Sequence, residues 1–452
     1  MTGEDTLRRA ERVIAPARAA GADEAEVFVE EVAATHVRVF DGAVDSLRTT
    51  RSRGFGLRVV VGGRPGYAFA AGDKLGDLAD RAVRSAHLTH PDPGSGLPAV
   101  VAAAPVPEAC QQTMSEVPLE DKIAAALAME RAARAAHPLI VSTEDVEYFD
   151  FDRAVAVVST AGARCLGQQS LAILNATAVA GGVGGCQSGT ACSYGRTFAA
   201  LRPEENGRRA AARAARVANA RPIPTAELPV ILDPWVAARF VDLLAHAVSA
   251  ESVRKGRSRL KDRIGDLVAS RAITVVDDGR LGAAPFAAPF DAEGVPTRRT
   301  AVIGAGRLEG FLFDTYEARA AGRCSTGNAV RASFRDQPVL GRNSFYVAAG
   351  DRSPEAILQS THRGLYVQEI QGMHLANPVS GDFSVGVTGG WIEAGGWVHA
   401  VRGVTIAGNL FDLLAGVDAV GRDLQFASPP TVIVACSGSP TLRVSSLVVS
   451  GV

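Results

Sequence analysis

The feature that most restricts the fold is a period-two alternation of apolar and polar residues that recurs through the first part of the chain. It runs through segments 25–40, 44–48 and 56–61, which are separated by Asp41-Gly42 and Gly62-Gly63. Successive side chains of a β-strand point to opposite faces, so this pattern indicates strands with one face against a core. Asp-Gly and Gly-Gly favour the tight turns that join neighbouring antiparallel strands. We therefore predict an antiparallel meander.

Helical periodicity surrounds these strands. We expect helices over 4–20, in the range 74–90, from Pro118 to just before Pro138, and over 203–218. Proline is well placed in the first turn of a helix and ends a helix that reaches it. From about residue 270 the pattern is almost entirely of short strands, with a final helix near 408–416.

These patterns predict an α+β fold class, with an antiparallel sheet in an N-terminal α+β region and a β-rich C-terminal domain. The proline-rich segments 91–107 and 219–225 are typical of linkers between structural elements or domains. We expect domains over 1–220 and 226–452.

Charge and composition exclude several functional classes. Lys+Arg (47) nearly equals Asp+Glu (48), so we expect neither a nucleic acid nor an anionic membrane as partner. The first residues do not resemble a signal sequence, and no apolar run reaches the roughly 18 residues of a membrane helix. We therefore expect a cytoplasmic protein. Its six cysteines show no C-x-x-C spacing, which is typical of buried free thiols.

Several C-terminal segments share one family pattern. They are Gly372-Met-His-Leu-Ala-Asn-Pro-Val-Ser-Gly-Asp-Phe, Val401-Arg-Gly-Val-Thr-Ile-Ala-Gly-Asn, Ser325-Thr-Gly-Asn-Ala-Val-Arg and the closing Ser439-Pro-Thr-Leu-Arg-Val. Together they resemble the signature of the TldD/PmbA family of zinc peptidases. The resemblance implies a C-terminal domain of strands curled into a barrel-like sheet, and a dimer that encloses a central cavity.

The resemblance also implies which branch of the family this chain follows. In the TldD branch a helix carries H-E-x-x-x-H and a later cysteine completes the zinc site. Here the corresponding positions are Val241, Asp242 and His246. Valine cannot bind a metal, so the resemblance implies a TldE-like subunit with no catalytic residue, metal or cofactor of its own. Zinc is then expected in a TldD-like partner subunit, with which this chain forms a heterodimer.

Two alternatives remain open for the degenerate motif. Asp242 and His246 lie four residues apart on one helical face, where a hydrogen bond between them is the common outcome. Both can also bind a metal, with His374 as the best third donor. An independent hydrolase that uses Asp242 and His246 would need that arrangement.

The loop 372–383 contains the candidate substrate contacts: His374, Asn377, Ser380 and Asp382. Polar turn residues before a strand are frequent in binding sites, and the resemblance implies that this loop faces the cavity. The alternative is that the loop only closes a hairpin. The function we expect is support of a zinc peptidase or amide hydrolase that acts on unfolded peptides or peptide-like natural products. The alternative function is a non-enzymatic, peptide-binding homodimer.

Overall fold

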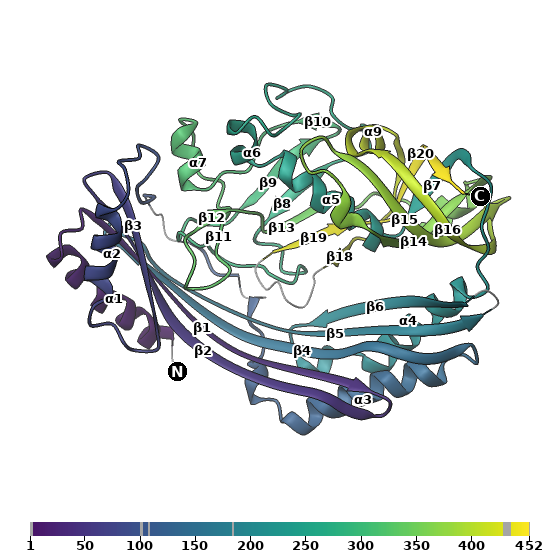
Figure 1. Ribbon diagram of the computed structural model, residues 1–452, viewed down its shortest axis with the longest axis horizontal. Coiled ribbons are helices and arrows are strands. Elements are labelled where there is room, and N and C mark those ends of the chain that lie inside the picture. Colours follow the sequence, from purple (N-terminus) through teal and green to yellow (C-terminus); the bar gives the residue numbers. More distant parts are fainter. Residues whose placement is uncertain (1–2, 100–102, 107–108, 183–184, 428–434, 452) are drawn as a thin grey trace.

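The computed structural model describes residues 3–99, 103–106, 109–182, 185–427 and 435–451, and all structural statements refer to them. They form a long curved sheet with helices on one face and a β-rich C-terminal half on the other (Figure 1). This mixed architecture confirms the predicted α+β class.

The curved sheet has six strands in the order β3-β2-β1-β4-β5-β6, all antiparallel to their neighbours. The first three are β1 (Glu24–Phe40), β2 (Ala43–Val61) and β3 (Arg64–Ala71). The other three are β4 (Ile140–Ser159), β5 (Arg164–Gly182) and β6 (Gly185–Gly195). The predicted meander is confirmed. Asp41 and Gly42 both have positive φ, as a tight hairpin turn requires.

Four helices cover the convex face of this sheet. They are α1 (Gly3–Ala19), α2 (Leu78–His87), α3 (Leu119–Ala135) and α4 (Pro203–Val217). Helices α1 and α2 pack on one end and α3 and α4 on the other, which gives two separate apolar clusters. All four helices agree with the predicted ranges, although α1 begins one residue earlier than expected.

The C-terminal half contains a closed barrel of five strands, in the order β16-β15-β14-β7-β20, because β16 also pairs with β20. The barrel strands are β7 (Ala226–Leu232), β14 (Arg363–Gln371), β15 (Asp382–Glu393), β16 (Gly396–Asn409) and β20 (Leu442–Ser450). Strand β17 (Val417–Val420) adds to β20. The barrel-like domain is therefore confirmed.

A second sheet lies beside the barrel and packs on the curved sheet through residues of β4 and β5. Its order is β10-β9-β8-β13-β19-β18. These strands are short: β8 (Val275–Asp278), β9 (Arg299–Gly304), β10 (Arg307–Leu308), β13 (Ser344–Val347), β18 (Gln425–Ala427) and β19 (Cys436–Ser439). A two-stranded ribbon pairs β11 (Ala329–Val330) with β12 (Val339–Leu340).

The C-terminal half contains more helix than the sequence pattern predicted. Besides α9 (Leu410–Ala415), which matches the expected final helix, it contains α7 (Thr315–Ala320) and α8 (Pro354–Gln359). Both have only six residues and begin at a side-chain cap, from Asp314 and from Ser353. Helices this short leave little periodicity to detect.

Candidate functional site

The degenerate motif lies on α5 (Pro234–Ala247), which packs between the barrel and the second sheet. Two residues fix the start of this helix. Asp233 accepts a hydrogen bond from the backbone N–H of Trp235 at 3.1 Å, and Pro234 occupies the first turn. A short helix, α6 (Ala250–Arg254), follows directly.

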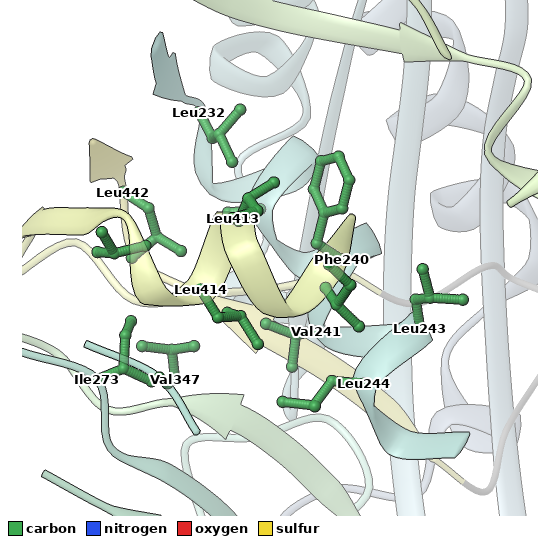
Figure 2. Close-up of a cluster of buried hydrophobic side chains, with 14 of the residues drawn as sticks. Leu232, Phe240, Val241, Leu243, Leu244, Ile273, Val347, Leu413, Leu414 and Leu442 are labelled. Carbon is green, nitrogen blue, oxygen red and sulfur yellow. The ribbon is translucent and has the colours of Figure 1, made fainter. Parts of the chain in front are cut away.

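Val241 is a core residue. Its side chain is 1% exposed and lies among apolar side chains from α5, α9 and the second sheet, including Leu244, Leu414 and Val347 (Figure 2). A polar ring placed here would lose its water and would need a buried partner. The position at which the family resemblance expects a metal-binding imidazole is therefore occupied by a core residue of the C-terminal half.

Asp242 has partners other than the one expected. Its Oδ1 accepts a hydrogen bond from Ser437 Oγ at 2.8 Å and forms an ion pair with the Arg342 guanidinium. The same guanidinium donates through Nε to Ser437 Oγ at 3.2 Å. The Asp242 carboxylate thus contacts β19 and the segment that leads into β13, whereas His246 is exposed at the end of the helix.

Cys436 stands next to Ser437 but on the other face of β19. Consecutive residues of a strand point to opposite faces, and Cys436 packs in the apolar cluster between the second sheet and the curved sheet. Burial raises the pKa of its thiol to about 12, so the thiol stays protonated. This thiol and the carboxylate of Asp242 therefore do not converge on one point.

These residues do not fit a zinc ion. A zinc site takes about four donors in a tetrahedron, mostly imidazole, thiolate and carboxylate. Val241 offers no donor, Asp242 is engaged by Arg342, and Cys436 faces away. Across the described ranges, no three His, Cys, Asp or Glu side chains are grouped so that they could hold a metal, so His374 does not complete a set with Asp242 and His246.

The candidate substrate loop joins β14 to β15. Asn377 Oδ1 accepts from the backbone N–H groups of Val379 (2.9 Å) and Ser380 (3.2 Å), which is an Asx turn. Ser380 Oγ donates to Asp382 Oδ2 at 2.7 Å, and Asn409 Nδ2 donates to Asp382 Oδ1 at 2.8 Å. These bonds hold the pKa of Asp382 below its usual value. Three of the four predicted contacts therefore shape the loop itself.

His374 differs from the other three. It lies in a single 3₁₀ turn (Met373–Leu375) and is exposed. The neighbouring Leu375 is 74% exposed, so an apolar and an imidazole side chain project together from the loop. Whether these residues touch a substrate stays a prediction.

The loop and α5 are neighbours through the segment after α6. Ser258 Oγ donates to the carbonyl of Ala247 at the end of α5 (2.6 Å), and Arg259 donates to the carbonyl of Ser380 (3.3 Å). Phe383, near the start of β15, meets Phe240 of α5 edge to face at 4.9 Å between ring centroids. The end of α5 and the substrate loop thus lie on one side of the C-terminal half.

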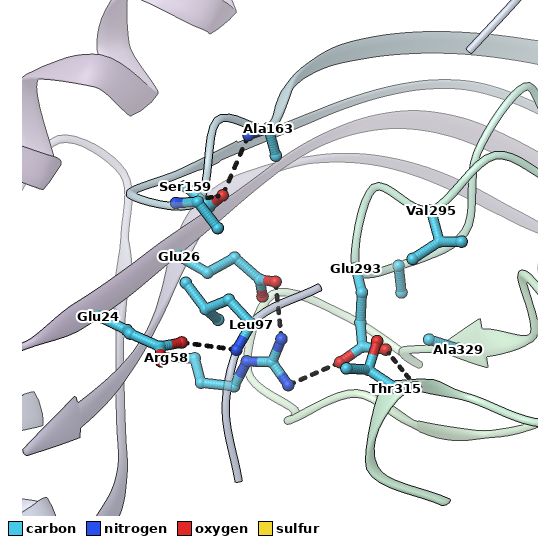
Figure 3. Close-up of polar contacts among 12 residues, drawn as sticks. Glu24, Glu26, Arg58, Leu97, Ser159, Ala163, Glu293, Val295, Thr315 and Ala329 are labelled. Atoms are coloured by element: carbon cyan, nitrogen blue, oxygen red, sulfur yellow. Dashed lines mark hydrogen bonds and ion pairs between the residues drawn. The ribbon is translucent and has the colours of Figure 1, made fainter. Parts of the chain in front are cut away.

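Sequence reasoning missed a buried ionic network that joins the two halves of the molecule (Figure 3). Arg58 of β2 donates to Glu26 of β1 at 2.8 Å and to Glu293 at 2.7 Å. Glu26 also pairs with Arg331, and both of these side chains are fully buried. Glu293 accepts from the backbone N–H of Thr315 at 3.0 Å. The ion-paired partners are 32 to 305 residues apart along the chain, so only the tertiary fold brings them together.

Profiles of known families match three consecutive parts of the chain. Residues 25–86 match domain 1 of the PmbA/TldA metallopeptidases, residues 113–218 match their central domain, and residues 225–451 match their C-terminal domain. The chain belongs to the PmbA/TldD metallopeptidase family. This confirms the family resemblance seen in the sequence. The break between the second and third matches falls within the proline-containing segment 219–225.

The matches to individual relatives extend over almost the whole chain. A metalloprotease of Methanothermobacter thermautotrophicus is 28% identical and the match covers 91% of this chain and 92% of the relative. The metalloprotease PmbA of Escherichia coli O157:H7 is 28% identical, with 90% and 89% covered. Among solved structures, a candidate modulator of DNA gyrase from Thermotoga maritima is 26% identical, with a TM-score of 0.88 and 98% and 99% covered.

Within the described ranges, none of the helices combines the length and the apolar character that a membrane span needs.

Proposed function

We propose that this chain is the TldE-like subunit of a heterodimeric zinc peptidase or amide hydrolase of the cytoplasm, and that a TldD-like partner carries the zinc. The substrate would be an unfolded peptide or a peptide-like molecule. Membership of a metallopeptidase family supports the reaction class, and the structure of α5 supports the division of labour between the two chains.

The observation that carries the proposal is the environment of Val241 and Asp242. At 1% exposure Val241 is part of the core, and the Asp242 carboxylate is balanced by Arg342. The same carboxylate also accepts a hydrogen bond from Ser437 Oγ, so it is engaged within this chain and does not stand free as a general base. In this proposal the partner therefore supplies the metal ligands and the general base.

This chain would contribute substrate contacts from the loop between β14 and β15. The internal hydrogen bonds of Asn377, Ser380 and Asp382 fix the loop's shape, and a rigid loop binds with less loss of conformational entropy. His374 and Leu375 then present one polar and one apolar group to an extended peptide. The Asx turn is thus compatible with both the hairpin-closing and the substrate-binding interpretation.

Co-expression with a TldD-like chain from the same genome tests the proposal. We expect hydrolysis of an unfolded fluorescent peptide only in the mixture, and stoichiometric zinc only in the partner after the two chains are separated. His374→Ala should raise the KM of the complex, whereas His362→Ala, in the connection that precedes β14, is the matched control. Hydrolysis by the isolated chain would contradict the proposal.

Metal analysis of the isolated chain addresses the independent hydrolase directly. If the isolated chain contained one zinc per molecule, and His246→Ala lost it, this chain would have its own centre and the supporting role would be wrong. Peptide binding without hydrolysis, even beside the zinc-bearing partner, would instead favour the non-enzymatic peptide-binding homodimer.

A further inference from the structure

The segment 254–263, at the end of α6 and after it, is the most basic ten-residue stretch of the chain. Its basic residues are Arg254, Lys255, Arg257, Arg259, Lys261 and Arg263. Asp262 is its single acidic residue. Since the whole chain is nearly neutral, the rest of it is net acidic. A local excess of positive charge on such a protein attracts anions to this one place.

Half of these cations are neutralised within the chain. Arg254, Lys255 and Arg263 form ion pairs, and their partners are, in the same order, Glu317, Glu251 and Asp266. The other three are exposed, and none of them has an ion-pair partner in the part of the chain that the structure describes. Their charges are therefore available to a ligand.

The unpaired cations lie beside the candidate substrate loop between β14 and β15. Arg259 donates to the carbonyl of Ser380 at 3.3 Å, and its guanidinium lies over the ring of Phe411, 5.2 Å from the centroid. These contacts hold Arg259 against the loop. Arg257 and Lys261 flank it, two residues away on either side, and among the described residues their side chains have no hydrogen-bond partner. A positively charged surface thus borders the loop.

We propose that the peptides bound at this loop are acidic, and that Arg257 and Lys261 bind the carboxylate side chains of their Asp or Glu residues. This inference rests on the proposed function, because it assigns a chemical class to the substrate of that site. Opposite charges across an interface contribute mainly to specificity and to the rate of association. His374 and Leu375 contact the part of the peptide that lies on the loop, and the two cations select the residues beside it.

An acidic peptide fits this surface better than a nucleic acid does. Proteins that bind single-stranded nucleic acids combine a basic groove with aromatic side chains on which the bases stack. The segment 254–263 contains no aromatic residue. A phosphate backbone would also extend past the unpaired cations, along a chain whose remainder is net acidic. Carboxylates on a short peptide need only the local charges.

Fluorescence anisotropy of the full-length chain with two short, unstructured peptides tests the proposal. One peptide contains glutamates where the other contains glutamines, and both are acetylated and amidated so that their only carboxylates are side chains. At low salt the acidic peptide should bind about tenfold more tightly, which two exposed ion pairs at the upper end of their usual strength can supply. This preference should disappear at high salt, because exposed charges are then screened.

The double variant Arg257→Gln/Lys261→Gln should weaken binding of the acidic peptide about five- to tenfold and change binding of the glutamine peptide less than about twofold. Lys74→Gln/Arg84→Gln is the matched control. It removes the same net charge from two exposed cations of the N-terminal region, which have no ion-pair partner among the described residues. The control should bind both peptides as the wild type does.

The proposal is overturned if the wild type binds the two peptides equally or binds neither, or if both double variants lose the same affinity. Tighter binding of a single-stranded oligonucleotide than of the acidic peptide would also overturn it. Hydrolysis by the mixture with the TldD-like partner decides the proposed function separately. If neither peptide is cleaved but the acidic preference persists, the proposed function fails and the acidic-peptide site stands. Cleavage of both peptides with equal kcat/KM and without a binding preference would refute only this inference.

Discussion

Replacing Arg58 by methionine should destabilise the protein by about 3–5 kcal/mol, because it removes one partner of a buried ion pair. Arg58 contacts two carboxylates, Glu26 and Glu293, whose side chains are 0% and 2% exposed. Glu26 keeps Arg331 as a second partner, so the loss falls mainly on Glu293. We therefore expect the loss of one buried pair rather than of two.

The pH dependence of this loss has a defined sign. Burial raises the pKa of Glu293, but the charge of Arg58 and the hydrogen bonds that Glu293 accepts outweigh it, so the pKa lies below its usual value. Without the guanidinium, burial dominates and the pKa of Glu293 should rise above its value in the unfolded chain. The folded state then binds the proton more tightly, and stability falls as the pH rises through that window. The deficit should be largest near pH 8 and smaller near pH 5.

Urea unfolding followed by circular dichroism at both pH values measures this effect. The double variant Arg58→Met/Glu293→Gln is the control, since it removes the unpaired charge and should recover most of the stability. A loss below about 1 kcal/mol in the single variant would refute the reasoning. So would a double variant that is no more stable than the single one.

Three further predictions concern other positions. Val241→His should destabilise the protein by about 1–3 kcal/mol, as expected for an unsatisfied buried polar group. Asp242→Asn, at a side chain that is 45% exposed, should change stability by less than about 1 kcal/mol. Thermal unfolding of both variants measures the two losses, and equal losses would contradict the assignment of Val241 to the core. Gly207→Ala should destabilise the protein by about 1–3 kcal/mol, although alanine has the better helix propensity. The new Cβ would lie 2.1 Å from the carbonyl oxygen of Met129 and would force α3 and α4 apart. A rise in the melting temperature would contradict this prediction and show that the two helices can adjust. Burial raises the pKa of Asp314 to about 6, so ionisation of this carboxyl opposes folding above that pH. Asp314→Asn, which can still cap α7, should therefore be more stable than the wild type at pH 8 but not at pH 4. An equal change in the free energy of unfolding at both pH values would contradict the pKa shift.

Local patterns determined most of the secondary structure. The alternation in β1 and β2, the Asp41-Gly42 turn and the helices α3 and α4, which begin at or next to a proline, depend on only a few residues each, so the sequence alone is enough to predict them. The barrel was predictable only from the family resemblance. Its closure depends on the pairing of β16 with β20, and the sequence pattern of a strand does not indicate which other strand it pairs with.

The chemistry of the candidate site depended on tertiary structure. The sequence by itself showed that Val241 cannot hold a metal, since this follows from the residue type. That Asp242 pairs with Arg342, 100 residues away, and that Cys436 faces the opposite side of β19 from Ser437, came only from the fold. The same holds for the Arg58 network. Spacing along the chain limits only nearby contacts, whereas these contacts are set by how sheets and helices pack.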